Sequence, residues 1–144
     1  GPGGYGIIME WEGNQYEKEF SDGFRLTTNN RMELLAVIIG LETLKIQPME
    51  VVVFSDSKYV IDAVEKKWVF NWEKKAFKDK KNPDLWKRYL NIHRKHRVSF
   101  QWIKGHNSHP QNERCDQLAV KAAKQSPVNI DAFFEQSQNK PNKA

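Results

Sequence analysis

The stretch Val51-Val52-Val53-Phe54-Ser55-Asp56-Ser57-Lys58-Tyr59-Val60 decides the fold of this chain. Its first four residues are β-branched or aromatic, which is the pattern of a strand buried on both faces. The Ser-Asp-Ser that follows ends this strand and opens a helix, which we expect to run to about residue 65. A buried strand that leads directly into a helix is typical of α/β domains, so this unit predicts the fold class.

The rest of the sequence supplies elements on both sides of that unit. Upstream, alternating residues predict an antiparallel hairpin over 5–20 with its turn at 12–14, and helical spacing predicts a helix from 28 to 41. Downstream, we expect a helical segment rich in lysine and tryptophan at 66–81, a helix at 85–95, a strand at 98–102 and a helix at 112–124. The order β-β-α-β-α-α-α-β-α predicts an α/β domain with a mixed central sheet flanked by helices.

The composition bounds the class of protein. With 144 residues, 39% of them hydrophobic and 28% charged, the chain suits one globular domain with its own core. No stretch approaches the roughly 18 consecutive apolar residues of a membrane helix. Cys115 is the only cysteine, which excludes an internal disulfide and favours a cytoplasmic setting.

Positive charge is concentrated in one segment, residues 66–81, which we call the basic segment. It holds seven lysines, only two acids and four aromatic residues. A solvated helix face would explain the lysines, but not the aromatic residues among them. We therefore expect this segment to bind a phosphate backbone, with a solubilising role as the alternative. The candidate binding residues are Lys66, Lys67, Trp68, Trp72, Lys74, Lys75 and Lys78.

Three acids stand where expected helices or strands begin or end: Glu33, Asp56 and Asp116. Each has a structural explanation, because acids favour helix N-termini and Asp56 or a flanking serine could cap a helix. Together the three acids indicate a ligand site, because ligand sites of open α/β sheets lie at the carboxyl ends of strands, where Asp56 falls. Carboxylates gathered there would repel one another unless hard divalent cations such as Mg²⁺ or Mn²⁺ neutralised them. Two such ions can activate a water and stabilise the leaving oxygen of a phosphoryl displacement.

Three motifs in this order carry a resemblance to a known family. They are Thr27-Thr28-Asn29-Asn30-Arg31-Met32-Glu33-Leu34, the Ser55–Val60 stretch quoted above, and Gly105-His106-Asn107-Ser108-His109-Pro110-Gln111-Asn112-Glu113-Arg114-Cys115-Asp116. They closely resemble bacterial type 1 ribonuclease H, and the resemblance runs in register from Gly1 to about Lys124. It implies the ribonuclease H-like fold and the hydrolysis of RNA in RNA/DNA hybrids to 5′-phosphate and 3′-hydroxyl ends.

The resemblance also implies roles for particular residues. Glu33, Asp56 and Asp116 match three of the family's four metal-binding carboxylates, which hold two Mg²⁺ ions (or Mn²⁺) when substrate is bound. His106 matches a loop histidine that assists proton transfer or product departure. Thr28, Asn29 and Asn30 match a hybrid-binding turn, with a helix cap as an additional role for Asn30. The basic segment matches a protrusion that grips the hybrid.

One departure concerns the start of the chain. In the family a first strand ending in Asp-Gly-Ser precedes the turn that matches Gly1–Gly6, and it carries the fourth carboxylate. We expect a protein with this strand to be an active monomer. Without it, we expect an inactive protein that forms strand-swapped dimers or aggregates, because an interior strand is missing.

Two alternatives to the enzyme remain open from the sequence. One is a catalytically inactive module that binds RNA/DNA hybrids, and the other is the ribonuclease H portion of a reverse transcriptase. We expect the ribonuclease H domain at 1–125, followed by a polar, loosely ordered tail at 126–144 in which Phe133 and Phe134 could dock as an anchor.

Overall fold

The chain folds into two small sheets and six helices over the residues that the computed structural model describes, which are 1–12, 16–104, 109–125, 127 and 129–138. The elements are β1 (Gly3–Trp11), β2 (Tyr16–Phe24), α1 (Asn29–Glu42), β3 (Glu50–Ser55), α2 (Lys58–Glu65), α3 (Trp68–Lys74), α4 (Pro83–His93), β4 (Arg97–Trp102), α5 (Pro110–Lys124) and α6 (Ala132–Gln138). The predicted order is confirmed as far as α5. Within the described ranges no helix combines the length and apolar character needed to cross a membrane.

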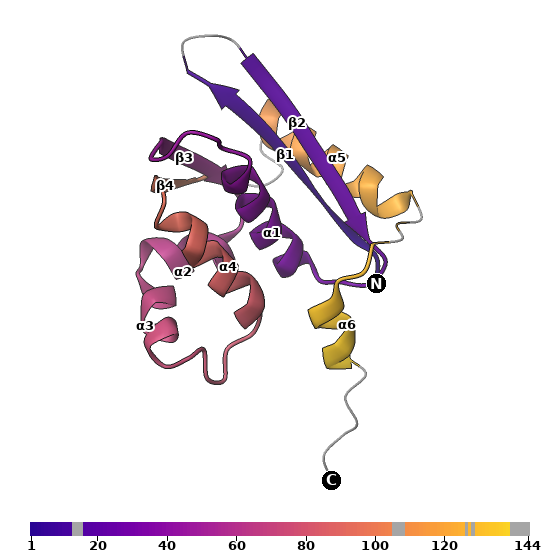
Figure 1. Ribbon diagram of the computed structural model, residues 1–144. Helices are drawn as coiled ribbons and strands as arrows, with labels where there is room; N and C mark the ends of the chain where they lie inside the picture. The colour runs from indigo at the N-terminus through magenta and orange to yellow at the C-terminus, as the bar shows by residue number, and fades with distance from the viewer. Residues whose placement is uncertain (13–15, 105–108, 126, 128, 139–144) are drawn as a thin grey trace.

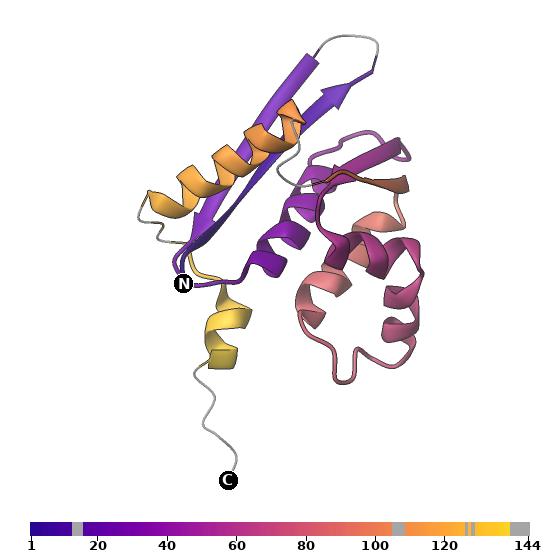
Figure 2. The ribbon, with the colours of Figure 1, turned by 180° about the vertical axis from the view of Figure 1, so that it is seen from behind.

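The strands pair in both senses. β1 and β2 form an antiparallel ribbon, whereas β3 and β4 pair in parallel with Ser55 opposite Trp102. In Figures 1 and 2 the ribbon of β1 and β2 lies on one side of α1, and α2, α3 and α4 lie on the other. The α/β class and the combination of antiparallel and parallel strands are confirmed, although the described strands form two separate two-stranded sheets.

The expected burial of β3 on both faces is wrong. Val51 and Val53 are half-buried, but Val52 and Phe54 are 50% and 53% exposed. The reason is the position of α5, which packs against β1 and β2 rather than against the outer face of β3. Since β3 has β4 as its only partner among the described strands, its backbone is covered on one edge only.

The core lies where α1 meets α2 and α4. Leu34 and Ile38 of α1 and Trp86 and Tyr89 of α4 are fully buried. The two α4 aromatics meet edge to face, with ring centroids 5.8 Å apart. The wide apolar arc of α1 is explained by its neighbours, because this helix packs on β1 as well as on α4.

The segment after α5 differs from the loosely ordered tail expected from its polar composition. Residues 129–138 contain α6, and Asp131 is buried. The main-chain N–H of Arg25 donates to the carbonyl of Asn129 (3.0 Å), which attaches this segment to the end of β2. The polar composition did not predict this ordered segment, because a single buried carboxylate paired with a charged side chain can stabilise it even when most of its other residues are polar and exposed. The domain boundary at residue 125 stays a prediction.

Two glycines of β1 let α5 approach the ribbon closely. A Cβ atom on Gly4 would collide with the backbone oxygen of Ala119, and one on Gly6 with the backbone oxygen of Cys115. This contact sets the depth of α5, and Asp116 is the next residue along that helix after Cys115. The Gly-rich start of β1 therefore positions one of the three candidate carboxylates.

The close contact predicts that Gly6→Ala destabilises the protein by about 1–3 kcal/mol, because backbone cannot yield as a flexible side chain does. Gly40→Ala is the matched control: a Cβ there meets only Ile7 Cγ2 at 3.6 Å, an ordinary contact. In the interior of α1 this control should stabilise by about 0.5–1 kcal/mol. Urea unfolding midpoints measure both effects. A Gly6→Ala variant as stable as the wild type would contradict the close approach of α5.

Candidate functional site

Asp56 lies at the carboxyl end of β3, as predicted, and does not cap the helix that follows. Ser57 caps α2, since its hydroxyl accepts a hydrogen bond from the backbone N–H of Val60 (3.3 Å). The carboxylate of Asp56 instead receives a long hydrogen bond from the side-chain amide of Asn112, in the first turn of α5 (3.5 Å). The structural explanation for Asp56 as a cap is thereby removed.

Glu33 and Asp116 also lie too far inside their helices for a role at the helix N-terminus to explain them. Glu33 is the fifth residue of α1, and the first turn of that helix contains no acid. Asp116 is the seventh residue of α5, where the first-turn acid is Glu113. The expectation that Glu33 stands at the beginning of its helix was therefore wrong. A favourable interaction with the helix dipole falls off within the first turn, so it does not account for either acid.

The three acids interact electrostatically although they come from α1, the end of β3 and α5. The pKa of Glu33 is raised to about 7, first by burial and then by the negative charges of Asp56 and Asp116. The pKa of the Cys115 thiol is raised to about 11, first by burial, with the charges of Asp116 and Glu33 among the further causes. The negative charges of Asp56 and Asp116 therefore act on Glu33 although the three residues belong to different parts of the fold.

This donor set suits a hard divalent cation in its chemistry. All three side chains offer carboxylate oxygens, the ligands that Mg²⁺ and Mn²⁺ prefer. A cation would offset the negative charges that, after burial, raise the pKa of Glu33. In the described part of the chain, however, no three acidic, histidine or cysteine side chains are grouped closely enough to form a ready-made metal centre. His106, the predicted loop histidine, lies outside the described residues.

The predicted hybrid-binding turn lies at the start of α1. Thr28 caps this helix, its hydroxyl accepting from the backbone N–H of Arg31 (3.2 Å). The cap role expected for Asn30 was therefore wrong. Asn29 and Asn30 are exposed, so their amide groups can contact a ligand.

The aromatic residues of the basic segment are mostly structural. Phe77 is buried in the core, and Trp72 meets Trp86 edge to face with centroids 5.9 Å apart. Trp68 remains 45% exposed, with the ammonium of Lys66 5.1 Å from its ring centroid. The lysines of the segment are all exposed: Lys66, Lys67, Lys74, Lys75, Lys78, Lys80 and Lys81. The basic segment thus presents exposed lysines to solvent, while most of its aromatic side chains pack against the protein interior.

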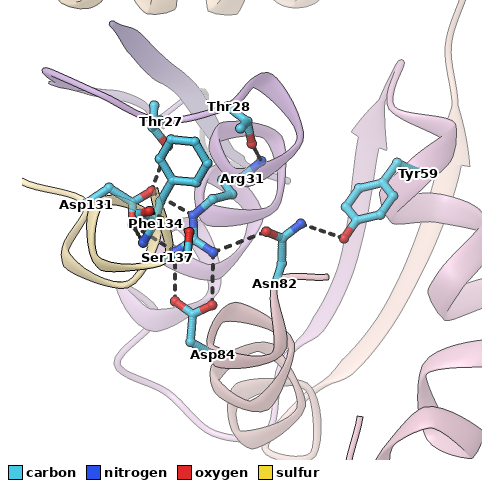
Figure 3. Close-up of polar contacts among 9 residues, drawn as sticks. All are labelled: Thr27, Thr28, Arg31, Tyr59, Asn82, Asp84, Asp131, Phe134 and Ser137. Carbon is cyan, nitrogen blue, oxygen red and sulfur yellow. Dashed lines mark hydrogen bonds and ion pairs between the residues drawn. The ribbon is translucent and has the colours of Figure 1, made fainter. Parts of the chain in front are cut away.

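Sequence reasoning missed a buried ion cluster beside the binding turn (Figure 3). Arg31 is 2% exposed and pairs with Asp84 and Asp131 at 2.7 Å each. These three residues, together with Thr27 and Asn82, form what we call the Arg31 cluster. The available signal was the place of Arg31 in a helix whose neighbouring positions are apolar. A charged residue in that position needs acidic partners.

A second unpredicted pair lies next to Asp56. The ammonium of Lys58 is 4.7 Å from the ring centroid of Trp102, and both side chains are exposed. Trp102 lies opposite Ser55 in the parallel pair of β3 and β4, which explains why these two residues meet. The pair adds a cation and an aromatic face close to the end of β3.

An α/β domain with electrostatically coupled carboxylates and a separate lysine surface is the combination expected of a metal-dependent nuclease. The sequence matches the RNase H family over residues 1–124. It is 54% identical over 136 residues to a ribonuclease H of Desulforamulus reducens, covering 91% of this chain and 84% of that protein.

Solved structures agree. LC9-RNase H1, described as a type 1 RNase H with the type 2 active-site motif, superposes with a TM-score of 0.77 at 30% identity, covering 94% of this chain and 71% of that one. LC11-RNase H1, solved in complex with RNA/DNA hybrid, gives a TM-score of 0.63 at 25% identity, covering 85% of this chain and 86% of that one. The chain therefore belongs to the ribonuclease H family, and the predicted resemblance is confirmed.

The raised pKa of Glu33 predicts a pH-dependent stability in the presence of a chelator. The folded state holds the proton of Glu33 up to about pH 7, whereas the unfolded state releases it near an ordinary glutamate pKa of about 4.3. Between these values the folded state binds more protons, so stability falls as pH rises. The loss should be on the order of 3 kcal/mol between about pH 4 and pH 8.

Glu33→Gln mimics the protonated side chain and should remove this fall. The measurement is the free energy of unfolding of both proteins against pH, first in chelator and then with Mg²⁺. Added Mg²⁺ should stabilise the wild type more at pH 8 than at pH 5. Parallel profiles for the two proteins would show that Glu33 is not crowded by negative charge.

Proposed function

We propose that this protein hydrolyses the RNA strand of RNA/DNA hybrids with Mg²⁺, or Mn²⁺, and leaves 5′-phosphate and 3′-hydroxyl ends. The observation that carries the proposal is the electrostatic coupling of Glu33 to Asp56 and Asp116 at the end of β3, in a chain of the ribonuclease H family. The hybrid bound to LC11-RNase H1 supports the choice of substrate.

The three carboxylates have a common role in this proposal. Glu33, Asp56 and Asp116 would hold the metal ions, with a fourth carboxylate expected from the family's first strand. Two ions at such a site can generate a nucleophilic hydroxide and stabilise the leaving oxygen. Asn112 orients the carboxylate of Asp56 through the hydrogen bond to its Oδ2. His106 would move a proton or assist product departure.

Selection of hybrids falls to the turn at the start of α1. The exposed amides of Asn29 and Asn30 and the backbone beside Thr28 are proposed to contact 2′-hydroxyls, which distinguish RNA from DNA. The lysines of the basic segment would contact phosphates and supply affinity independent of sequence. The candidate phosphate-binding residues of the basic segment are Lys66, Lys67, Lys74, Lys75 and Lys78, and Trp68 and Trp72 are its candidate aromatic contacts.

The second candidate function is a module that binds hybrids without cutting them. It is favoured by the absence, among the described residues, of a ready-made group of three metal ligands. The two functions share the lysine surface and differ only at the carboxylates. We also propose a cytoplasmic setting, because Cys115 is the only cysteine and a reducing compartment keeps it as a thiol.

Asp56→Asn separates the two functions. The variant should lose hybrid cleavage by a factor of at least about 10³, because the chemistry depends on the charge of the metal ligand. Its dissociation constant for hybrid should stay within about threefold of the wild type, since the lysine surface is untouched. Cleavage of a labelled hybrid in Mg²⁺ and fluorescence anisotropy provide the two readouts. A wild type that binds hybrid but does not cleave it would favour the binding module.

The lysine surface predicts a change in salt dependence. Replacing Lys74, Lys75 and Lys78 by Ala should weaken binding and flatten the log–log salt dependence by about 0.9 per lost phosphate contact, if the value for B-DNA applies. The matched control replaces Lys18, Lys45 and Lys95, three exposed lysines outside the segment, for the same change in net charge. Equal slopes for the two triple variants would assign the basic segment a solubilising role.

A further inference from the structure

The guanidinium of Arg31 is completely used inside the protein. Its Nε and Nη2 donate to Asp131 (2.7 and 2.9 Å), its Nη1 and Nη2 donate to Asp84 (2.9 and 2.7 Å), and Nη1 also donates to Asn82 (3.2 Å). A guanidinium has five N–H donors, so none remains for a ligand. Arg31 is therefore a buried structural ion directly after the residues Thr28–Asn30, which are proposed to bind nucleic acid.

The acidic partners of Arg31 come from two distant parts of the chain. Asp84 lies in the first turn of α4, directly after the basic segment, and Asp131 lies just before α6. Asp131 is tied from several sides, since it also accepts from the hydroxyl of Thr27 (2.7 Å) and from the backbone N–H of Phe134 (3.3 Å). Burial alone would raise the pKa of Asp131, but the hydrogen bonds from Arg31 and Thr27 outweigh it, so this pKa lies below its ordinary value.

The Arg31 cluster continues toward the carboxylate site. The amide of Asn82 donates to the hydroxyl of Tyr59 (2.9 Å), which also accepts from the indole N–H of Trp86 (3.0 Å). Tyr59 is the second residue of α2, the helix that begins after Asp56. Figure 3 shows this line of contacts from Asp131 through Arg31 and Asn82 to Tyr59.

The position of the cluster connects the surfaces that would contact substrate. Thr27 and Arg31 flank the residues Thr28–Asn30, and Asn82 follows Lys80 and Lys81 at the end of the basic segment. Asn82 itself has a left-handed backbone (φ 60°), and Phe77 and Asp79 within the segment do too (φ 58° each). Asn and Asp tolerate this conformation, but a bulky residue such as Phe77 adopts it only when its surroundings impose it, so this part of the basic segment depends on its contacts.

We infer that Asp131 is a positioning residue for hybrid binding, which through Arg31 fixes the turn Thr28–Asn30 relative to the end of the basic segment. The inference rests on the proposed function, because it assumes that this turn contacts RNA. The C-terminal segment thereby contributes to substrate recognition without touching the substrate. Asp84 supports the same arginine from the other side.

The test compares Asp131→Asn with Glu135→Gln. Both change a carboxylate to an amide in the same segment, but Glu135 is half-buried and pairs with the exposed Arg25, outside the cluster. Dissociation constants are measured by anisotropy for an RNA/DNA hybrid and for the DNA duplex of the same sequence, at a temperature where circular dichroism shows each variant folded. Asp131→Asn should weaken hybrid binding about tenfold, because a displacement of the contacting residues by about 1 Å is costly. It should weaken DNA binding less than about twofold, because the lysines that contact phosphates are unchanged. Glu135→Gln should change neither.

The outcomes distinguish a positioning role of Asp131 in hybrid binding from a role in protein stability alone. If Asp131→Asn lowers only the unfolding temperature and leaves both dissociation constants unchanged, the inference is overturned. If this variant does not fold, Asp84→Asn takes its place with the same expected loss of hybrid preference, and its failure to show that loss overturns the inference. Wild-type protein that binds hybrid but does not cleave it contradicts the proposed hydrolysis alone. Wild-type protein that binds neither contradicts both.

Discussion

The Glu33 carboxyl is buried beside the negative charges of Asp56 and Asp116, and both burial and these charges disfavour its ionised form. Glu33 is brought close enough to Asp56 and Asp116, and far enough from water, for its pKa to rise to about 7. Such crowding opposes folding, because a buried acid must either keep a proton or find a cation. A fold that retains this arrangement must hold α1, β3 and α5 in place against it.

Two features of the scaffold supply that rigidity. The glycines of β1 allow α5 to lie directly on the ribbon, which sets the position of Asp116. Near the N-terminal end of α1, two residues before Glu33, the Arg31 cluster joins this helix to α4 and to the segment before α6. A buried arginine with two acids is costly to desolvate, and removing one partner leaves an uncompensated charge. The geometry of the cluster is therefore strongly specified, which suits a site that must hold several binding elements in register.

Much of the fold could be predicted because local patterns agreed with one another. The β-branched residues 51–54, the turn signals around the hairpin and the helical spacing of α1 each gave the right element. The exposure of Val52 and Phe54 was not predictable, since it depends on where α5 packs rather than on the strand itself. Asp56 was correctly placed at a strand end, whereas Glu33 and Asp116 were named from residue type and from the family resemblance, and the metal-binding role of all three stays a prediction. The Arg31 cluster could not, because it joins residues about 100 positions apart, and no local pattern indicates that Asp131 meets Arg31.

The central claim is that Glu33 shares a negatively charged site with Asp56 and Asp116 that a divalent cation would neutralise. The most direct measurement is a pH titration of the Glu33 side-chain carboxyl by carbon NMR, first in chelator and then in Mg²⁺. We expect a pKa of about 7 without metal and a clear fall in this pKa when Mg²⁺ is added. An ordinary glutamate pKa of about 4.3 in chelator, or a raised value that Mg²⁺ leaves unchanged, would contradict it.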